Sequence, residues 1–373
     1  MSKKTPHTVQ QDQAPCFLLA AGGTGGHMFP AITLAKTLID QGAHLLFVTD
    51  KRGASFLPPL ERTTVHLLRS THFQGDLRHK LKAAWAFLRD GLTVPRLLYQ
   101  RRSIQKVMGF GGFSSFWPVV WARLFKKPCA LYQADAVMGR TNRFLAPWTH
   151  AVFLGFKATQ AQCPKGKEVG LIARHTRPVA LYPARKPEDP LHLLILGGSQ
   201  GARFFSHVIP QAICLLPEAQ QHLLHITQQC RAEDQKSAEE AYRQTQAHVE
   251  LPAFINDVHT ALSDAHLVMA RAGTGTISDL VHAGRPALFV PYPYAANNHQ
   301  YQNALLACNS GGGWIKTQKD CSPSKLASFL QECLENPTAL TDKAHRMQQA
   351  IPVGALAPLT HWFFPSAVQD PAG

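Results

Sequence analysis

Short, continuous apolar runs alternate along the chain with stretches in which apolar residues recur every three or four positions. The first apolar run, residues 16–21, leads directly into glycines, and helical spacing follows over residues 30–39. Continuous apolar runs are typical of strands buried in a parallel sheet, whereas a period near 3.6 is typical of the helices that cover such a sheet. The pattern therefore predicts an α/β fold in which strands and helices alternate.

The same alternation continues through both halves of the chain. In the first half we expect strands at 44–49 and 128–133 and a helix at 77–89. In the second half we expect strands at 223–227, 266–270 and 287–290 and a short helix at 276–282. Gly284 and Pro286 follow that helix, as is typical of a helix end.

A glycine-rich loop after a strand occurs twice. The pattern Gly-Gly-Thr-x-Gly starting at Gly22 returns as Gly-Gly-Ser-x-Gly starting at Gly197, an offset of 175 residues. This offset has the size of a domain, and the prolines between the two loops indicate a linker (Pro178, Pro183, Pro187 and Pro190). The chain is therefore predicted to form two doubly wound, Rossmann-like domains that face a cleft, over residues 1–178 and 179–352.

Glycines after a strand allow the backbone to approach a phosphate, and the N-terminus of the next helix supplies N–H donors. A dinucleotide fingerprint fails at the first loop, because Met28 stands where the third glycine belongs. Asp50 nevertheless lies about where a ribose-binding acid would sit, so NAD binding is one alternative. Plain tight turns are another, although two equivalent loops weaken that interpretation.

The charge of the chain is concentrated in its first half. Residues 1–180 hold 25 lysines and arginines against 8 aspartates and glutamates, whereas residues 181–373 hold 13 against 16. The first half is therefore expected to meet an anionic partner. No apolar run is long enough for a membrane span or a signal-peptide core, and the eight scattered cysteines include no Cys-x-x-Cys pair. These features favour reduced thiols and a cytoplasmic protein.

A basic amphipathic segment lies between residues 77 and 106. Leu81, Trp85 and Leu88 recur there at helical spacing, and only Asp90 opposes the positive charge. The basic residues are Arg78, Lys80, Lys82, Arg89, Arg96, Arg101, Arg102 and Lys106. Such a helix is typical of docking on an anionic membrane surface, and a core helix with a solvated basic face is the alternative. No recognisable DNA- or RNA-binding motif accompanies the charge, so a nucleic-acid partner is not expected.

Six motifs occur in order from about residue 16 to 350. They are Ala21-Gly-Gly-Thr-Gly-Gly-His-Met-Phe-Pro30, Gly109-Phe-Gly-Gly-Phe113, Gly139-Arg-Thr-Asn-Arg-Phe-Leu-Ala146, Gly197-Gly-Ser-Gln-Gly-Ala202, Arg271-Ala-Gly-Thr-Gly-Thr-Ile-Ser-Asp279 and His299-Gln-Tyr-Gln-Asn-Ala304. Together they closely resemble the motifs of bacterial UDP-N-acetylglucosamine:lipid I N-acetylglucosaminyltransferases. The resemblance implies the GT-B fold, with the donor held mainly by the C-terminal domain and a helix at about 353–373 that rejoins the N-terminal domain.

The resemblance also implies an activity and a location. The family transfers GlcNAc from UDP-GlcNAc to the C4 hydroxyl of MurNAc in lipid I, with inversion, and so forms lipid II for peptidoglycan. Its members are peripheral proteins on the cytoplasmic face of the inner membrane, and cell-wall synthesis proteins are possible partners. No resident cofactor is implied, and no metal-binding Asp-x-Asp pair stands in the motifs, although free magnesium could assist.

Site residues are carried over motif by motif. The implied UDP-GlcNAc contacts are Thr24, Gly25, Gly26, Asp135, Arg174, Ser199, Ile255, Thr274, Gly275, Thr276, Ile277, Ser278, Asp279 and Gln300. The implied acceptor or diphosphate loop contains Gly109, Gly111 and Gly112. Without the resemblance, Asp279 and Gln300 would equally fit solvated surface positions.

Two residues are candidates for catalysis. His27 follows the first glycine loop, and an imidazole can accept a hydroxyl proton near neutral pH. It could act as general base, position the substrate or be structural. Asp135 stands where the family has an asparagine, so it could be a carboxylate base or indicate altered specificity.

Two further departures concern the donor. Asp279 replaces a glutamate, and Leu171-Ile172 replace the Asn-Pro that precedes the family's arginine, here Arg174. These departures keep two other hypotheses open. One is a GT-B UDP-sugar transferase with a different lipid acceptor, and the other is a non-catalytic protein that binds membranes or nucleic acid.

Overall fold

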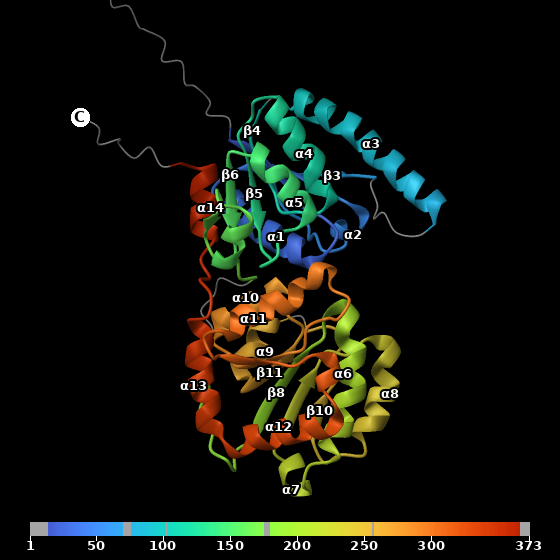
Figure 1. Ribbon diagram of the computed structural model, residues 1–373, viewed down its shortest axis with the longest axis vertical. Coiled ribbons are helices and arrows are strands. Elements are labelled where there is room, and N and C mark those ends of the chain that lie inside the picture. The colour runs from blue at the N-terminus through green and yellow to red at the C-terminus, as the bar shows by residue number, and fades with distance from the viewer. Residues whose placement is uncertain (1–13, 70–75, 102, 175–179, 256, 366–373) are drawn as a thin grey trace, which may run out of the picture.

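The computed structural model describes residues 14–69, 76–101, 103–174, 180–255 and 257–365. Within these residues the chain forms two parallel sheets, one in each half, with helices on their faces (Figure 1). The strand orders are β3-β2-β1-β4-β5-β6-β7 and β10-β9-β8-β11-β12-β13. Both orders are those of doubly wound, Rossmann-like domains, so the predicted fold class is confirmed.

The elements of the first half are β1 (Cys16–Ala20), α1 (Gly25–Asp40), β2 (His44–Thr49), α2 (Lys51–Ala54), β3 (Thr63–Leu67), α3 (Leu77–Gln100), β4 (Ile104–Gly109), α4 (Phe113–Leu124), β5 (Cys129–Gln133), α5 (Arg140–Leu145), β6 (Ala151–Leu154) and β7 (Lys167–Glu168). Short 3-10 helices lie at Ala146–Trp148 and Lys157–Gln162.

The elements of the second half are β8 (Leu191–Leu196), α6 (Gly198–Ile213), α7 (Glu218–Gln221), β9 (Leu224–Gln228), α8 (Ala232–Tyr242), β10 (His248–Glu250), α9 (Val258–Asp264), β11 (Leu267–Ala270), α10 (Thr274–Ala283), β12 (Ala287–Phe289), α11 (His299–Cys308), β13 (Gly313–Ile315), α12 (Pro323–Glu335), α13 (Pro337–Gln348) and α14 (Leu356–Phe363). Short 3-10 helices lie at Ala296–Asn298 and Gln318–Asp320.

In each sheet the chain first adds strands on one side of its first strand and then crosses over to the other side. In the first sheet β1 pairs with β2 on one side and with β4 on the other, and in the second sheet β8 lies between β9 and β11. Ligands of doubly wound sheets bind at the carboxyl ends of the strands beside this crossover. The fold therefore directs attention to the loops after β1, β4, β8 and β11.

Helix bounds differ from the predicted ones where glycines or proline lie inside a helix. α1 begins at Gly25 rather than at residue 30, and α10 begins at Thr274 rather than at 276. α3 continues to Gln100 although it contains Pro95. Pro95 cannot donate to the carbonyl of Gly91, and the indole Nε1 of Trp121 donates to that carbonyl instead at 2.8 Å. This replacement explains why the helix does not end before the proline.

The end of the described chain returns to the first half. α14 lies beside β6 in Figure 1, and the ring of Phe363 packs 4.8 Å from that of Phe17 in β1. Lys106, which the sequence placed in the basic segment, lies in β4 and donates from Nζ to the carbonyl of Trp362 at 2.5 Å. This lysine caps α14, so it is not part of a basic helix surface.

The linker between the halves packs against the second half. The boundary predicted at 178 falls within 175–179, outside the described residues. Beyond it, Arg185 is buried, and its Nη1 donates to the carbonyl of Leu334 at 3.1 Å. The hydroxyl of Tyr182 donates to the carbonyl of His266 at 3.1 Å.

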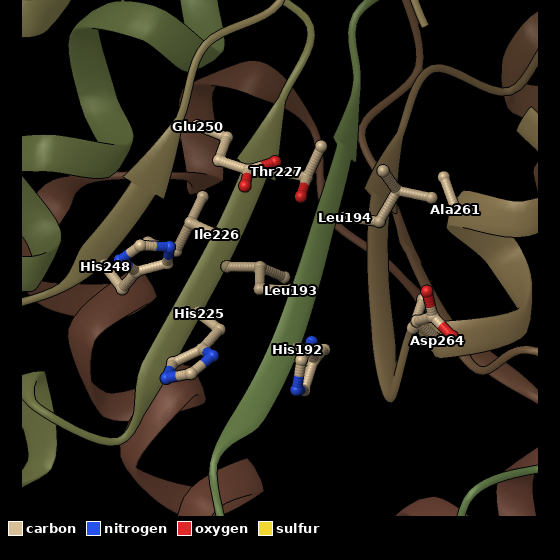
Figure 2. A pocket seen from close by; sticks show the side chains of 11 residues that line it. His192, Leu193, Leu194, His225, Ile226, Thr227, His248, Glu250, Ala261 and Asp264 are labelled. Atoms are coloured by element: carbon tan, nitrogen blue, oxygen red, sulfur yellow. The ribbon is translucent and has the colours of Figure 1, made fainter. Parts of the chain in front are cut away.

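Histidines form a row across the amino ends of the strands of the second sheet. His192, His225 and His248 lie on the neighbouring strands β8, β9 and β10 and line a cavity of about 240 Å³ (Figure 2). The ring centroid of His225 lies 5.0 Å from that of His192 and 5.2 Å from that of His248. The ring centroid of His266 lies 5.3 Å from that of His192. These histidines lie at the amino ends of the strands, whereas the glycine loops follow the carboxyl ends.

This row is expected to make the protein less stable in acid. Burial, together with the neighbouring charges of His192 and Arg185, lowers the pKa of His266 to about 4, and its Nδ1 accepts a hydrogen bond from the backbone N–H of His192 at 2.9 Å. The His266 ring binds a proton more readily in the unfolded state than in the folded state. The neutral ring therefore stabilises the folded state fully above about pH 6.5, and this stabilisation is lost as the pH falls toward 4. We expect this titration of His266 to lower the free energy of unfolding by about 2 kcal/mol when the pH falls from 7 to 5.

Urea unfolding of wild type and of His266→Asn at the two pH values measures this loss. The asparagine carbonyl can still accept from His192 but does not titrate, so the variant should lose less stability on acidification. Equal losses in the two proteins would contradict the assignment.

Candidate functional site

The loop after β1 leads into the amino end of α1. Gly23 has a φ of +81°, which a residue with a side chain rarely adopts, and it turns the chain into the helix. The side chain of Thr24 does not cap the helix, and α1 begins with Gly25 and Gly26. The first amides of a helix have no partner within it, so these glycines present N–H groups without side chains in front of them.

His27 lies in this first turn. Its Nδ1 is 3.2 Å from the carbonyl oxygen of Gly22. A carbonyl can only accept, so Nδ1 carries the proton of the neutral ring and Nε2 has the free lone pair. The hydrogen bond therefore selects the tautomer in which Nε2 can accept a proton from a ligand.

The loop after β4 packs against this imidazole. Gly111 and Gly112 have φ values of +109° and +74°, and a Cβ at Gly111 would lie 2.9 Å from Nε2 of His27. Both positions therefore require glycine. Gly109, which was predicted in the same loop, is instead the last residue of β4, and the side chains of Ser115, Leu131 and Val119 surround it. Its role is packing, because a side chain there would meet its neighbours.

Asp50 is occupied by structural contacts. Its Oδ1 accepts from the backbone N–H of Gly53 at 2.7 Å and caps α2, and its Oδ2 accepts from the hydroxyl of Ser114 at 3.2 Å. A ribose-binding acid needs its carboxylate for the sugar hydroxyls. The contacts of Asp50 therefore argue against the NAD alternative.

The amino end of α10 meets that of α1 across the two halves. A Cβ at Gly26 would lie 3.7 Å from the hydroxyl oxygen of Thr274. Within the described residues, the buried hydroxyls of Thr274 and Ser278 have no hydrogen-bond partner. Two helix dipoles and these hydroxyls can together receive a diphosphate. We call this meeting place, formed by residues 22–27 and 273–279, the junction.

Not every residue predicted in α10 can contact a ligand at the junction through its side chain. Gly275 and Thr276 are partly exposed in the first turn, whereas Ile277 is fully buried in the core of the second half. Ile277 can therefore contribute only its backbone to a ligand. Ile255 is partly buried and packs against the same core.

Arg174 and Asp279 bind each other at the junction. Arg174 donates from Nε to Oδ2 of Asp279 at 2.6 Å, its backbone N–H donates to Oδ1 at 3.2 Å, and Nη2 also pairs with Oδ2. The carboxylate is 4% exposed, and the guanidinium lies 5.1 Å from the ring centroid of Phe29. The sequence predicted both Arg174 and Asp279 as contacts of UDP-GlcNAc. A ligand that uses both must share or rearrange this ion pair.

Gln300 and Ser199 complete the predicted donor contacts. Gln300 lies in the first turn of α11, and its Oε1 accepts from the backbone N–H of Tyr292 at 2.9 Å, which leaves its NH₂ group to donate. Ser199 lies in the first turn of α6, at a position whose side chain is outside the described residues.

Asn303 was not among the predicted site residues. It lies in α11, is fully buried, and donates from Nδ2 to Oδ1 of Asp135 at 2.9 Å. The sixth motif contains it, but only the tertiary structure brings it to Asp135, which follows β5 in the other half. Asp135 itself is partly exposed.

Arg271 positions a loop instead of facing the junction. It is buried, donates from Nη1 to the carbonyl of Val290 at 2.9 Å and lies over the rings of Phe204, Phe205 and Tyr292. Burial lowers its pKa to about 10. In the part of the chain that the structure describes, no group of three or more histidines, cysteines or acids is arranged to hold a metal ion.

Two family models match the chain, one in each half. The Glycosyltransferase family 28 N-terminal domain matches residues 17–154, and the Glycosyltransferase family 28 C-terminal domain matches residues 192–355. The crystal structure of MurG from Acinetobacter baumannii superposes with a TM-score of 0.77 at 26% identity and covers 94% of this chain and 99% of its own. These matches confirm the predicted GT-B arrangement of two Rossmann-like domains.

Curated relatives match over nearly the whole chain. The UDP-N-acetylglucosamine--N-acetylmuramyl-(pentapeptide) pyrophosphoryl-undecaprenol N-acetylglucosamine transferase of Paramagnetospirillum magneticum is 40% identical over 346 residues, which are 89% of this chain and 91% of the relative. The transferase of the same name from Brucella suis is 37% identical and covers 88% of each chain. The chain therefore belongs to glycosyltransferase family 28 and, within it, to the family of these N-acetylglucosamine transferases.

Proposed function

We propose that this protein transfers GlcNAc from UDP-GlcNAc to the C4 hydroxyl of MurNAc in undecaprenyl-pyrophosphoryl-MurNAc-pentapeptide, with inversion, and so forms lipid II. The names of the relatives support this donor and acceptor. The observation that carries it is the junction, where the amino ends of α1 and α10 meet beside the buried hydroxyls of Thr274 and Ser278. Two converging helix ends are suited to the diphosphate of a sugar nucleotide.

The diphosphate is also the leaving group, and its negative charge grows in the transition state. The glycine amides at the start of α1, the dipole of α10 and the guanidinium of Arg174 provide fixed positive charge for it. The helix amides are in place before reaction and need no reorganisation as the charge develops, whereas the guanidinium of Arg174 meets the diphosphate by sharing or rearranging its ion pair with Asp279. The proposal needs no resident cofactor, and free magnesium can add to the same charge.

His27 is the general base of this proposal. Its Nε2 takes the proton of the acceptor hydroxyl, the hydroxyl oxygen bonds to the anomeric carbon, and the bond from that carbon to the UDP oxygen breaks on the opposite side. One displacement inverts the anomeric centre without a covalent intermediate. The tautomer selected by the carbonyl of Gly22 supports this role, and Asp135 is the second group able to bind a sugar hydroxyl or its proton.

The transfer assay of the isolated protein tests the function. Radiolabelled UDP-GlcNAc and a short-chain lipid I analogue are expected to yield a disaccharide lipid. UDP-GlcNAc binding without transfer would favour a different lipid acceptor, and neither binding nor transfer would contradict the enzyme proposal.

The outer face of α3 supports a peripheral position on a membrane. Leu81, Trp85 and Leu88 are 61%, 64% and 62% exposed, so they are not the core stripe of a packed helix. The buried face of α3 is a different one, formed by Ala83, Asp90, Val94 and Leu98. Arg78, Lys82, Arg89 and Arg96 are exposed on the helix, which projects from the first half in Figure 1.

We propose that this face docks on the anionic cytoplasmic surface of the inner membrane, where a lipid-linked acceptor is held. In the described residues no helix has the length and apolar character needed to cross a bilayer. Partners among the cell-wall synthesis proteins stay a prediction from the sequence.

Binding to vesicles tests the membrane face. Leu81→Ser with Trp85→Ser is expected to weaken binding to phosphatidylglycerol-containing vesicles at least about tenfold, because each substitution removes apolar surface that would enter the interface. Cosedimentation at low and high salt measures it, and salt should weaken wild-type binding as well. Leu215→Ser, at a leucine in the second half that is 59% exposed, is the matched control. Equal binding of all three proteins would exclude α3 as the docking face.

A further inference from the structure

Asn303 joins the two halves through a single buried amide. It belongs to α11 of the second half and is fully buried. Its Nδ2 donates to Oδ1 of Asp135 at 2.9 Å and to the carbonyl of Ala272 at 3.3 Å, and its Oδ1 accepts from the backbone N–H of Ala136 at 2.8 Å. Both N–H bonds of the Asn303 amide and its carbonyl oxygen therefore have partners. Two of these three hydrogen bonds reach the loop after β5, in the first half.

The partners determine which way the amide points. The N–H of Ala136 can only donate and the carbonyl of Ala272 can only accept, so exchanging the oxygen and nitrogen of Asn303 would break both contacts. The remaining N–H then faces Asp135, where it meets a carboxylate that can accept it. Because the amide is buried, loss of any one contact would leave a polar group unpaired.

The first half holds the same loop from the other side through its backbone carbonyls. Gln133 donates from Nε2 to the carbonyl of Asp135 at 3.0 Å, and Thr159 and Gln162 donate to the carbonyl of Ala136 at 3.0 Å each. None of these three residues bonds the Asp135 carboxylate. Within the described residues, the hydrogen bond to that carboxylate comes from Asn303, across the boundary between the halves.

We propose that Asn303 is a positioning residue, which orients the Asp135 carboxylate toward the sugar hydroxyls and makes this orientation depend on the two halves being together. The inference rests on the proposed transfer reaction. One oxygen of Asp135 is held by the amide, and no hydrogen bond to the other is present within the described residues. A carboxylate anchored through one oxygen can offer the second to a hydroxyl of donor or acceptor in a defined direction.

A carboxylate at residue 135 differs chemically from an amide of the same size. An asparagine at 135 could also accept from Asn303, but its outer group would be an amide that carries no charge. Holding a carboxylate there instead provides a stronger acceptor for a sugar hydroxyl. Asn303 would therefore support a specificity or rate contribution that is particular to Asp135.

Steady-state transfer kinetics of four variants test this. Asn303→Ala is expected to lower kcat about ten- to a hundredfold while KM for UDP-GlcNAc changes less than about threefold, because misplacing a reacting group affects kcat most. Asp135→Asn should lower kcat by a similar factor. If the two act together, the double variant Asp135→Asn with Asn303→Ala loses no more than either alone. Asn309→Ala, at an exposed asparagine that ends the same helix, is the matched control and should keep wild-type kinetics.

The exchanged pair, Asp135→Asn with Asn303→Asp, separates positioning from a merely structural contact. It keeps one carboxylate and one amide in contact, so it should recover thermal stability relative to Asn303→Asp alone, which brings two carboxylates together. It should not recover kcat, since the carboxylate is then buried at 303. Recovery of kcat by the exchanged pair, or losses that multiply in the double variant, would overturn the inference. An inactive wild type would instead show that the proposed function itself is wrong.

Discussion

Replacing His27 by alanine is expected to lower kcat of GlcNAc transfer by about a hundred- to ten-thousandfold, the usual contribution of a positioned general base. Nε2 of this residue has the free lone pair because Nδ1 donates to the carbonyl of Gly22. Binding of UDP-GlcNAc should change little, since the diphosphate is proposed to bind the helix amides at the junction and not the ring. Steady-state kinetics and isothermal titration with UDP measure the two effects separately.

His27→Asn distinguishes the base from a structural role of the ring. The asparagine Nδ2 can take the place of Nδ1 and donate to Gly22, but it offers no basic nitrogen toward the ligand. The asparagine variant should therefore fold like wild type and remain as inactive as the alanine variant. His345→Ala, at an exposed histidine of α13, is the control. Substantial transfer by His27→Asn would contradict the assignment and leave Asp135 as the candidate base.

Replacing Arg174 by alanine is expected to affect both stability and transfer. The carboxylate of Asp279 is 4% exposed and accepts hydrogen bonds from the Arg174 side chain. Removing the arginine side chain therefore leaves the buried charge of Asp279 unpaired. Breaking a buried ion pair from one side costs about 3–5 kcal/mol. Because Arg174 is also the side-chain cation proposed for the leaving diphosphate, kcat/KM should fall by about a further hundredfold or more.

The double variant Arg174→Ala with Asp279→Ala separates these two effects. Removing both charges should recover most of the lost stability but not the transfer activity. Thermal unfolding and kcat/KM are the two measurements. Arg203→Ala is the control. The Arg203 side chain is 81% exposed and its Nε lies 3.8 Å from Oδ1 of Asp234, and such an exposed ion pair contributes little to stability. Recovery of transfer by the double variant would remove Arg174 from the reaction.

The predicted strands could be recognised along the chain because they are continuous apolar runs that are buried on both faces. The predicted strand at 44–49 is β2 without change, and the one at 128–133 is β5 to within a residue. β4 was not predicted, since Gln105 and Lys106 interrupt its apolar run, and the short strands β3, β6, β7, β10 and β13 were not predicted either. Lys106 is tolerated there because the carbonyls at the end of α14 accept from it, a contact between residues 256 positions apart.

The glycine loops were also predictable, since glycine is required wherever backbone must approach a ligand or adopt a positive φ. The local sequence could not show what each polar side chain contacts. Asp50 lies where a ribose-binding acid was considered, but it caps α2 and accepts from Ser114. Arg174 and Asp279 were both predicted to contact the donor, and in the structure they bind each other.

The sequence by itself determined the fold class, the two halves, the positions of the glycine loops and the amphipathic helix. Each of these depends on local periodicity or on the conformational freedom of glycine, and both can be read along the chain. Only the tertiary structure decided that Leu81, Trp85 and Leu88 face outward, that Gly26 lies beside Thr274 and that Asn303 bonds Asp135. Those arrangements depend on contacts between residues far apart in the chain, which packing of complete elements creates and no local pattern encodes.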